Sequence, residues 1–98
     1  MAPTKLEIKV NVVKRLLKES KLYDEEASDQ EKALSDMKER HEDPYLIHKQ
    51  EVLLKEAQMM ITEIRKKVED QRTNLAKYLD NYDGDEDTSE ARALIGVN

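Results

Sequence analysis

The acidic segment around Gly84 comes closest to a chemical motif in this sequence. Calcium loops alternate oxygen ligands around a glycine that makes the turn. The side chains that would supply these ligands are Asn81, Asp83, Asp85, Asp87 and Glu90. The first ligand position, however, is occupied by Leu79, and the usually apolar eighth position by Glu86. Because a principal carboxylate is missing, we favour a solvated acidic turn over a calcium site and predict no bound metal.

Catalytic constellations are also missing. His41 and His48 are seven residues apart, but Pro44 interrupts any helix between them, and no further metal ligands accompany them. The serines have no paired His and Asp arrangement that would activate a nucleophile. With only two glycines, the chain cannot form the phosphate-binding motifs GxGxxG or GxxxxGK[ST]. We therefore predict that the protein is not an enzyme and needs no cofactor.

A row of apolar residues spaced seven apart predicts a long helix in the second half of the chain. Its members are Ile47, Leu54, Ile61, Val68, Leu75 and Tyr82. A period of seven keeps one stripe of a helix facing its neighbour, as in left-handed coiled coils and bundles. We expect the first five members to lie in the core. Leu46, Leu53, Met60 and Leu79 widen the stripe enough to face two neighbours.

The helix boundaries follow from capping residues. Thr4 and Glu7 form a capping-box spacing, and Asp43 followed by Pro44 is a strong start signal for a second helix. The expected elements are helix 5–40, helix 44–81, acidic loop 80–88 and helix 89–97. A short connection makes the two long helices antiparallel. The sequence thus predicts an all-α fold in one domain, 1–98: an antiparallel three-helix bundle with two long helices, a short third helix and left-handed coiled-coil-like packing.

Composition and charge narrow the possible environments and partners. Charged residues make up 40% of the 98 residues, and there is no cysteine. No apolar run approaches the roughly 20 residues of a membrane span, so we expect a cytoplasmic protein without membrane contact. The net charge of −5 resides in the six acids and one Arg of residues 80–98. Without a dominant basic face or an aromatic platform, nucleic-acid binding is not expected.

Two sets of side chains are candidates for partner binding. Basic clusters and an adaptable methionine suggest docking of an acidic protein, although solvated helix faces would have the same composition; these residues are Lys14, Arg15, Lys18, Met59, Arg65 and Lys66. The first helix carries more apolar residues than one seam requires, and the third helix is too short to cover them all. Uncovered apolar surface is expected at Ile8, Val12 and Leu17, where a client or a second copy of the chain would bind.

Several short runs of the chain together resemble the tubulin-binding cofactor A family. They are Lys5-Leu6-Glu7-Ile8-Lys9, Val13-Lys14-Arg15-Leu16, Asp43-Pro44-Tyr45, Lys49-Gln50-Glu51, Met59-Met60-Ile61 and Glu90-Ala91-Arg92. The resemblance spans nearly the whole chain in the same order. It implies a three-helix bundle without enzymatic activity that captures β-tubulin and passes it to other tubulin-folding cofactors, which assemble the α/β heterodimer.

Two functions therefore remain open at the level of sequence. The first is a cytoplasmic, cytoskeleton-associated chaperone that binds β-tubulin in the post-chaperonin tubulin folding pathway. The alternative is a homodimeric coiled-coil structural adaptor. Both use helix faces rather than a cleft, because a small chain made mostly of long helices leaves little surface from which a cleft could be built.

Overall fold

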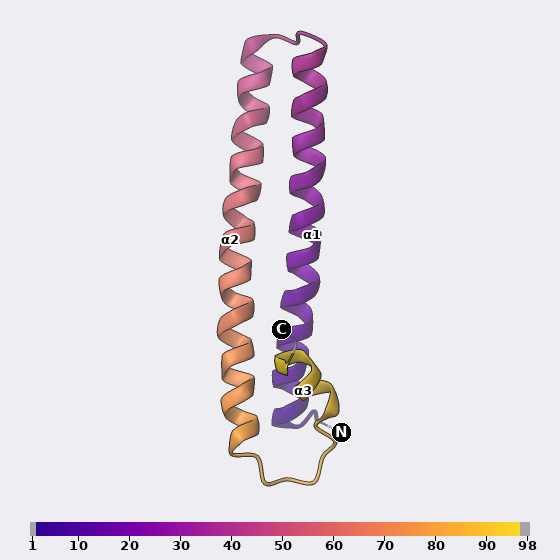
Figure 1. Cartoon of the computed structure of the whole chain (residues 1–98), viewed down its shortest axis with the longest axis vertical. Helices are drawn as coiled ribbons and strands as arrows, with labels where there is room; N and C mark the ends of the chain where they lie inside the picture. The colour runs from indigo at the N-terminus through magenta and orange to yellow at the C-terminus, as the bar shows by residue number, and fades with distance from the viewer. Residues whose placement is uncertain (1, 97–98) are drawn as a thin grey trace. The chain divides into compact units, whose positions relative to one another are not determined.

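The computed structural model describes residues 2–96 and contains three helices. They are α1 (Lys5–Glu39), α2 (Pro44–Asp80) and α3 (Ser89–Gly96) (Figure 1). No strand occurs among the described residues. The predicted all-α fold with two long helices and a short third one is confirmed. The expected helices ended at residues 40, 81 and 97, and the last of these positions lies outside the described residues.

The capping signals read from the sequence fix the starts of both long helices. The Thr4 hydroxyl accepts a hydrogen bond from the Glu7 backbone N–H at 3.1 Å. The Asp43 carboxylate accepts one from the Tyr45 N–H at 2.8 Å. Pro44, which has no N–H to donate, begins α2 directly after Asp43. Each cap satisfies an amide that has no partner inside its helix.

α1 ends in a Schellman motif that has histidine where glycine is usual. The Glu42 N–H donates to the Met37 carbonyl at 3.0 Å, and the His41 N–H donates to the Lys38 carbonyl at 3.1 Å. His41 adopts the left-handed conformation that this motif needs, with φ of 56°. A β-carbon in this region costs roughly 1–2 kcal/mol. Replacement by glycine would therefore relieve strain at the reversal between α1 and α2.

The acidic connection between α2 and α3 folds around a tyrosine. The Tyr82 hydroxyl accepts a hydrogen bond from the Glu86 N–H at 3.0 Å, and partial burial raises the pKa of Tyr82. A β-carbon on Gly84 would collide with the Tyr82 ring, which explains why the smallest residue stands there. The Glu86 carboxylate in turn accepts a hydrogen bond from the Thr4 hydroxyl at 2.8 Å. This segment is thus joined to the start of α1.

The chain divides into two compact units. The three-helix unit comprises Met1–Lys18 and Arg65–Asn98, and the two-helix unit comprises Glu19–Ile64. In the three-helix unit, α3 packs on the first part of α1 and the last part of α2 (Figure 1). In the two-helix unit the remaining parts of α1 and α2 run antiparallel. The expectation that residues 1–98 form one domain remains a prediction.

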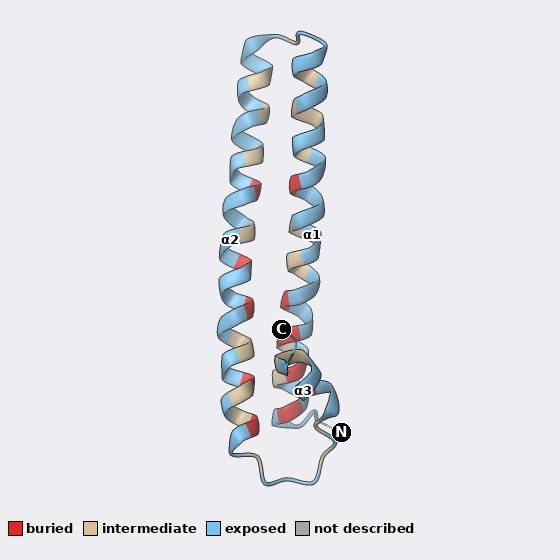
Figure 2. Ribbon diagram, in the orientation of Figure 1, coloured by how far each residue is buried: buried red, intermediate tan, exposed pale blue. Residues whose placement is uncertain are grey.

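Burial differs between the two units (Figure 2). The buried residues of the three-helix unit are Leu6, Val10, Val13, Leu16, Val68, Leu75, Leu79 and Ala91. Those of the two-helix unit are Ala27, Ala57 and Ile64. The predicted core positions Val68 and Leu75 are buried, but Ile47, Leu54 and Ile61 are only half-buried. The last three lie in the two-helix unit, where α3 adds no further neighbour, and they stay more exposed than Leu75.

Polar groups occupy part of the seam in the two-helix unit. The Gln50 side-chain amide donates to the Gln30 backbone carbonyl at 3.2 Å and also to the Gln30 side-chain oxygen. Both glutamines are half-buried. The hydrogen bonds join the two side chains, but the pair supplies less apolar burial than two leucines would.

Candidate partner-binding surfaces

The six predicted partner-binding residues are all exposed, but they belong to different units. Met59 lies in the two-helix unit, 58% exposed. The five basic residues, Lys14, Arg15, Lys18, Arg65 and Lys66, lie in the three-helix unit. The structure therefore assigns the five basic residues and Met59 to different units.

Among the basic residues of α1, the three predicted side chains occupy two sides of the helix. Lys14 and Lys18 are one helical turn apart and share a side, whereas Arg15 points about 100° away from Lys14. The Lys14 ammonium forms an ion pair with the Glu90 carboxylate of α3 at 3.4 Å. Lys14 thus contributes to holding α3, and any partner that binds it competes with Glu90.

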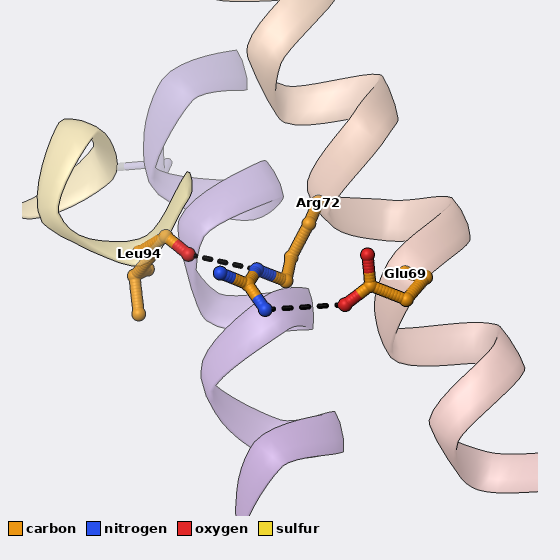
Figure 3. Close-up of polar contacts among 3 residues, drawn as sticks. All are labelled: Glu69, Arg72 and Leu94. Carbon is orange, nitrogen blue, oxygen red and sulfur yellow. Dashed lines mark hydrogen bonds and ion pairs between the residues drawn. The ribbon is translucent and has the colours of Figure 1, made fainter. Parts of the chain in front are cut away.

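α3 covers the apolar groove between the first part of α1 and the last part of α2. Ala91 is 1% exposed against a cluster of leucines and valines, and Leu94 and Ile95 pack beside it. The Arg72 Nε of α2 donates to the Leu94 carbonyl at 2.9 Å, and its Nη1 donates to the Glu69 carboxylate at 3.2 Å (Figure 3). Arg72 therefore supplies a partner to a carbonyl near the end of α3, where the helix itself offers none.

The predicted apolar surface on α1 is divided by the geometry of the helix. Ile8 is 50% exposed, Leu17 is 38% exposed and Val12 is half-buried. Ile8 and Val12 lie one turn apart on one side, but Leu17 lies nine residues from Ile8, roughly half a turn around the helix. The structure brings Ile8 and Val12 together and places Leu17 apart from them.

A shallow hollow lies beside Ile8. It has a volume of about 430 Å³ and is lined by Lys5, Ile8, Lys9 and Tyr78. The Lys9 ammonium lies 5.3 Å from the centre of the Tyr78 ring, a cation–π distance. The hollow therefore combines apolar walls with two positive charges. This combination suits a carboxylate that lies next to an apolar group.

One exposed apolar surface was predicted only in part, through Met59. It consists of six side chains on α2 in the two-helix unit, which we call the outer face of α2: Tyr45, Leu46, Val52, Leu53, Met59 and Met60. Met59 was predicted as a partner-binding residue, and Leu46, Leu53 and Met60 were noted as residues that widen the apolar stripe. The width of the apolar stripe on α2 could have revealed this surface. A stripe wide enough to contact two helices leaves one side exposed when only one helix packs against it.

The acidic residues of the α2–α3 connection act as hydrogen-bond acceptors for the fold. The Asp87 carboxylate accepts a hydrogen bond from the Ser89 N–H at 2.9 Å, and this bond lowers the pKa of Asp87. Across residues 2–96, no three His, Asp or Glu side chains converge as metal ligands would. Nor does any helix in that range have the length and apolar composition of a membrane span.

Comparison with known proteins identifies similar chains over nearly the whole sequence. The family model described as tubulin binding cofactor A matches residues 1–95. Tubulin-specific chaperone A of Saccharomyces cerevisiae is 40% identical over 96 residues, which cover 97% of this chain and 91% of the relative. The protein of the same name from Homo sapiens is 35% identical over 93 residues, covering 92% and 86%.

Two solved structures have the same fold. Rbl2p, a beta-tubulin binding post-chaperonin cofactor, superimposes with a TM-score of 0.89 at 37% identity, covering 95% of this chain and 92% of its own. Tubulin folding cofactor A from Arabidopsis thaliana superimposes with a TM-score of 0.80 at 28% identity, covering 93% and 89%.

Proposed function

Because the chain belongs to the tubulin-binding cofactor A family, we propose that it is a tubulin-folding chaperone whose partner is β-tubulin. The single observation that carries the proposal is the match, over nearly the full chain, to relatives named tubulin-specific chaperone A. In this role the chain captures β-tubulin released during folding. It passes β-tubulin toward α/β heterodimer assembly together with other tubulin-folding cofactors, in the cytoplasm and in association with the cytoskeleton.

The mechanism we propose is equilibrium binding without a catalytic step. A chaperone that binds only the folded client stabilises it by mass action, by about 2.7 kcal/mol when its free concentration is about a hundred times the Kd. Long helices with exposed charged and apolar side chains suit this task, because they offer contact area without a cleft. No nucleotide or metal is needed for such a cycle.

The proposed client surface in the three-helix unit is basic. All five of its predicted basic residues are exposed, and an acidic region of β-tubulin would be attracted to them. Arg15 and Arg65 supply planar guanidinium groups, which bind carboxylates with two parallel hydrogen bonds. Met59 belongs to the two-helix unit and would add an adaptable apolar contact.

Co-expression with β-tubulin and, separately, with α-tubulin tests the function. Size exclusion should show a complex with β-tubulin and none with α-tubulin. The Arg15→Glu/Arg65→Glu double variant should weaken the complex, while the Lys32→Glu/Lys55→Glu control, which changes charge equally at exposed positions of the two-helix unit, should not. Binding that survives the first variant would refute this surface, and absence of any complex with wild type would refute the function.

The homodimeric adaptor remains the second candidate, favoured by the exposed Ile8 beside the half-buried Val12. It predicts that light scattering reports a dimer at micromolar concentration and that Val12→Glu converts this dimer to a monomer. An adaptor would also bind no β-tubulin. The two functions thus differ in the co-expression experiment, whatever the oligomeric state.

A further inference from the structure

The hollow beside Ile8 lies between two lysines of α1 and a tyrosine of α2. Lys5, Ile8 and Lys9 belong to the first two turns of α1 and Tyr78 to the last turn of α2, all within the three-helix unit. Its volume of about 430 Å³ falls within the roughly 300–1,000 Å³ of protein ligand sites, although the hollow is shallow. A shallow hollow of this size suits a few side chains of a peptide better than a small molecule, which needs an enclosed cavity.

Both ammonium groups of the hollow lack an acidic partner within the chain. Neither Lys5 nor Lys9 forms an ion pair with any of residues 2–96. The acids nearby line a different hollow, to which Glu7, Glu86 and Glu90 contribute. Glu7 is two residues from Lys5 and therefore points about 200° away from it around α1. The positive charge of the hollow beside Ile8 is thus available to an anion from outside.

The stability of α1 does not account for these two lysines. Lys5 is the first residue of α1, where the partial positive charge of the helix start disfavours a cation. Lys5 and Lys9 are also one turn apart, and like charges at this spacing destabilise a helix. A glutamate at position 5 would be favourable on both counts. Anion binding at the hollow gives the two lysines a role that the fold does not give them.

We propose that the hollow beside Ile8 binds an acidic peptide segment of another protein, in which two acidic side chains lie next to an apolar one. The two carboxylates would pair with Lys5 and Lys9, and the apolar side chain would contact Ile8, which is 50% exposed. The Lys9 ammonium already lies 5.3 Å from the centre of the Tyr78 ring, so Lys9 loses less rotamer freedom on binding than a fully extended lysine would. The inference does not depend on the proposed chaperone function.

The apolar residues of the hollow favour this peptide over a phosphate group. A lysine ammonium binds carboxylates and phosphates alike as a point charge, so the lysines alone do not select between them. Ile8 and the Tyr78 ring add a favourable contact only when the ligand carries an apolar group beside its anion. Inorganic phosphate has no such group, whereas a carboxylate side chain followed by leucine has one.

Fluorescence anisotropy with three labelled synthetic peptides tests the ligand chemistry. The first repeats Glu-Glu-Leu, the second Glu-Glu-Ser and the third Gln-Gln-Leu. The first should bind at least about tenfold more tightly than either of the others, because only it supplies both the charge and the apolar contact. Its Kd should rise with salt concentration, since exposed ion pairs are screened. Equal binding of the first two peptides, or no binding of the first, would overturn the proposal.

Substitutions in the hollow test its location. Lys5→Glu should raise the Kd of the first peptide at least about tenfold and should also raise the melting temperature, because it removes the repulsion along α1. Ile8→Ser should raise the Kd about threefold and leave the helical circular dichroism unchanged, since the side chain is half exposed. The Lys67→Glu control makes the same charge change at an exposed position of the same unit and should leave the Kd unchanged. A loss of affinity as large in the control as in Lys5→Glu would refute the hollow as the site.

Nuclear magnetic resonance of the wild-type chain locates the peptide independently. Titration with the first peptide should shift the backbone amide signals of residues 5–12 and 76–80 more than those of residues 40–60. Shifts concentrated outside the hollow would refute the site. Vesicles of phosphatidylcholine and phosphatidylserine serve as the second ligand class and should not bind. Vesicle binding that Lys5→Glu abolishes, combined with no binding of the first peptide, would assign the hollow to a membrane and overturn the proposal.

Discussion

The two units of this chain use the same two helices but differ in what covers them. In the three-helix unit, α3 adds a third wall, and residues such as Val13 and Leu75 are fully buried at 0% exposure. In the two-helix unit, the buried side chains are Ala27, Ala57 and Ile64, while most of the large apolar side chains that remain exposed belong to α2. The eight-residue α3 thus accounts for the difference: the unit that contains it has a buried core, and the other unit keeps apolar side chains exposed.

The largest expected effect is the removal of a fully buried leucine. Leu75→Ala should lower the free energy of unfolding by about 3 kcal/mol, because it leaves a cavity among packed side chains. Leu54→Ala in the two-helix unit should cost roughly half as much, because its side chain is only half-buried. Urea titration followed by circular dichroism measures both. Equal losses would remove the distinction between the units.

Replacing the glutamine pair tests whether the two-helix unit is weakened by its polar seam. Gln50→Ala leaves the half-buried Gln30 amide without this partner and should cost about 1 kcal/mol. Gln30→Leu/Gln50→Leu replaces both polar groups with apolar ones and should instead raise the melting temperature. A double variant as unstable as Gln50→Ala would show that the hydrogen bonds matter more here than apolar burial.

Removal of the contact between Arg72 and α3 should weaken the packing of α3 on the two long helices. Arg72→Met loses the hydrogen bond to the Leu94 carbonyl and should destabilise the packing of α3 by about 1 kcal/mol. Faster amide hydrogen exchange in residues 89–96 would report this. Lys14→Met removes only an exposed ion pair to Glu90 and should cost about 0.5 kcal/mol or less. If both variants exchange alike, Arg72 has no special part in holding α3.

Acid should weaken the start of α3 once the Asp87 carboxylate becomes protonated. The folded pKa of Asp87 lies below its ordinary value of 3.8, so its contribution is complete above that pH and is lost as the pH falls through the lowered pKa. Asp87→Asn keeps an oxygen acceptor without a charge and should remove this part of the pH dependence of hydrogen exchange in α3. Asp85→Asn is the matched control on the same loop, and an identical effect there would contradict the assignment to Asp87.

Sequence reasoning located the helices because their signals are local. Thr4, Asp43 and Pro44 act on amides within one turn, so the starts of α1 and α2 could be read directly. The reversal after α1 gave a weaker signal, since His41 occupies the left-handed position where a glycine would have been recognised. The basic residues were correctly expected to be exposed, but their division between units depends on contacts far apart in the sequence.

The sequence by itself determined which side of each long helix turns inward. The seven-residue spacing from Ile47 to Leu75 places these side chains on one stripe whatever the surroundings. Only the tertiary structure decided how deeply each is buried, since burial needs neighbours on several sides. α3 supplies such neighbours to Leu75, whereas Ile47 faces one helix alone and stays half-buried. The six apolar side chains of the outer face of α2 likewise stay exposed in the two-helix unit.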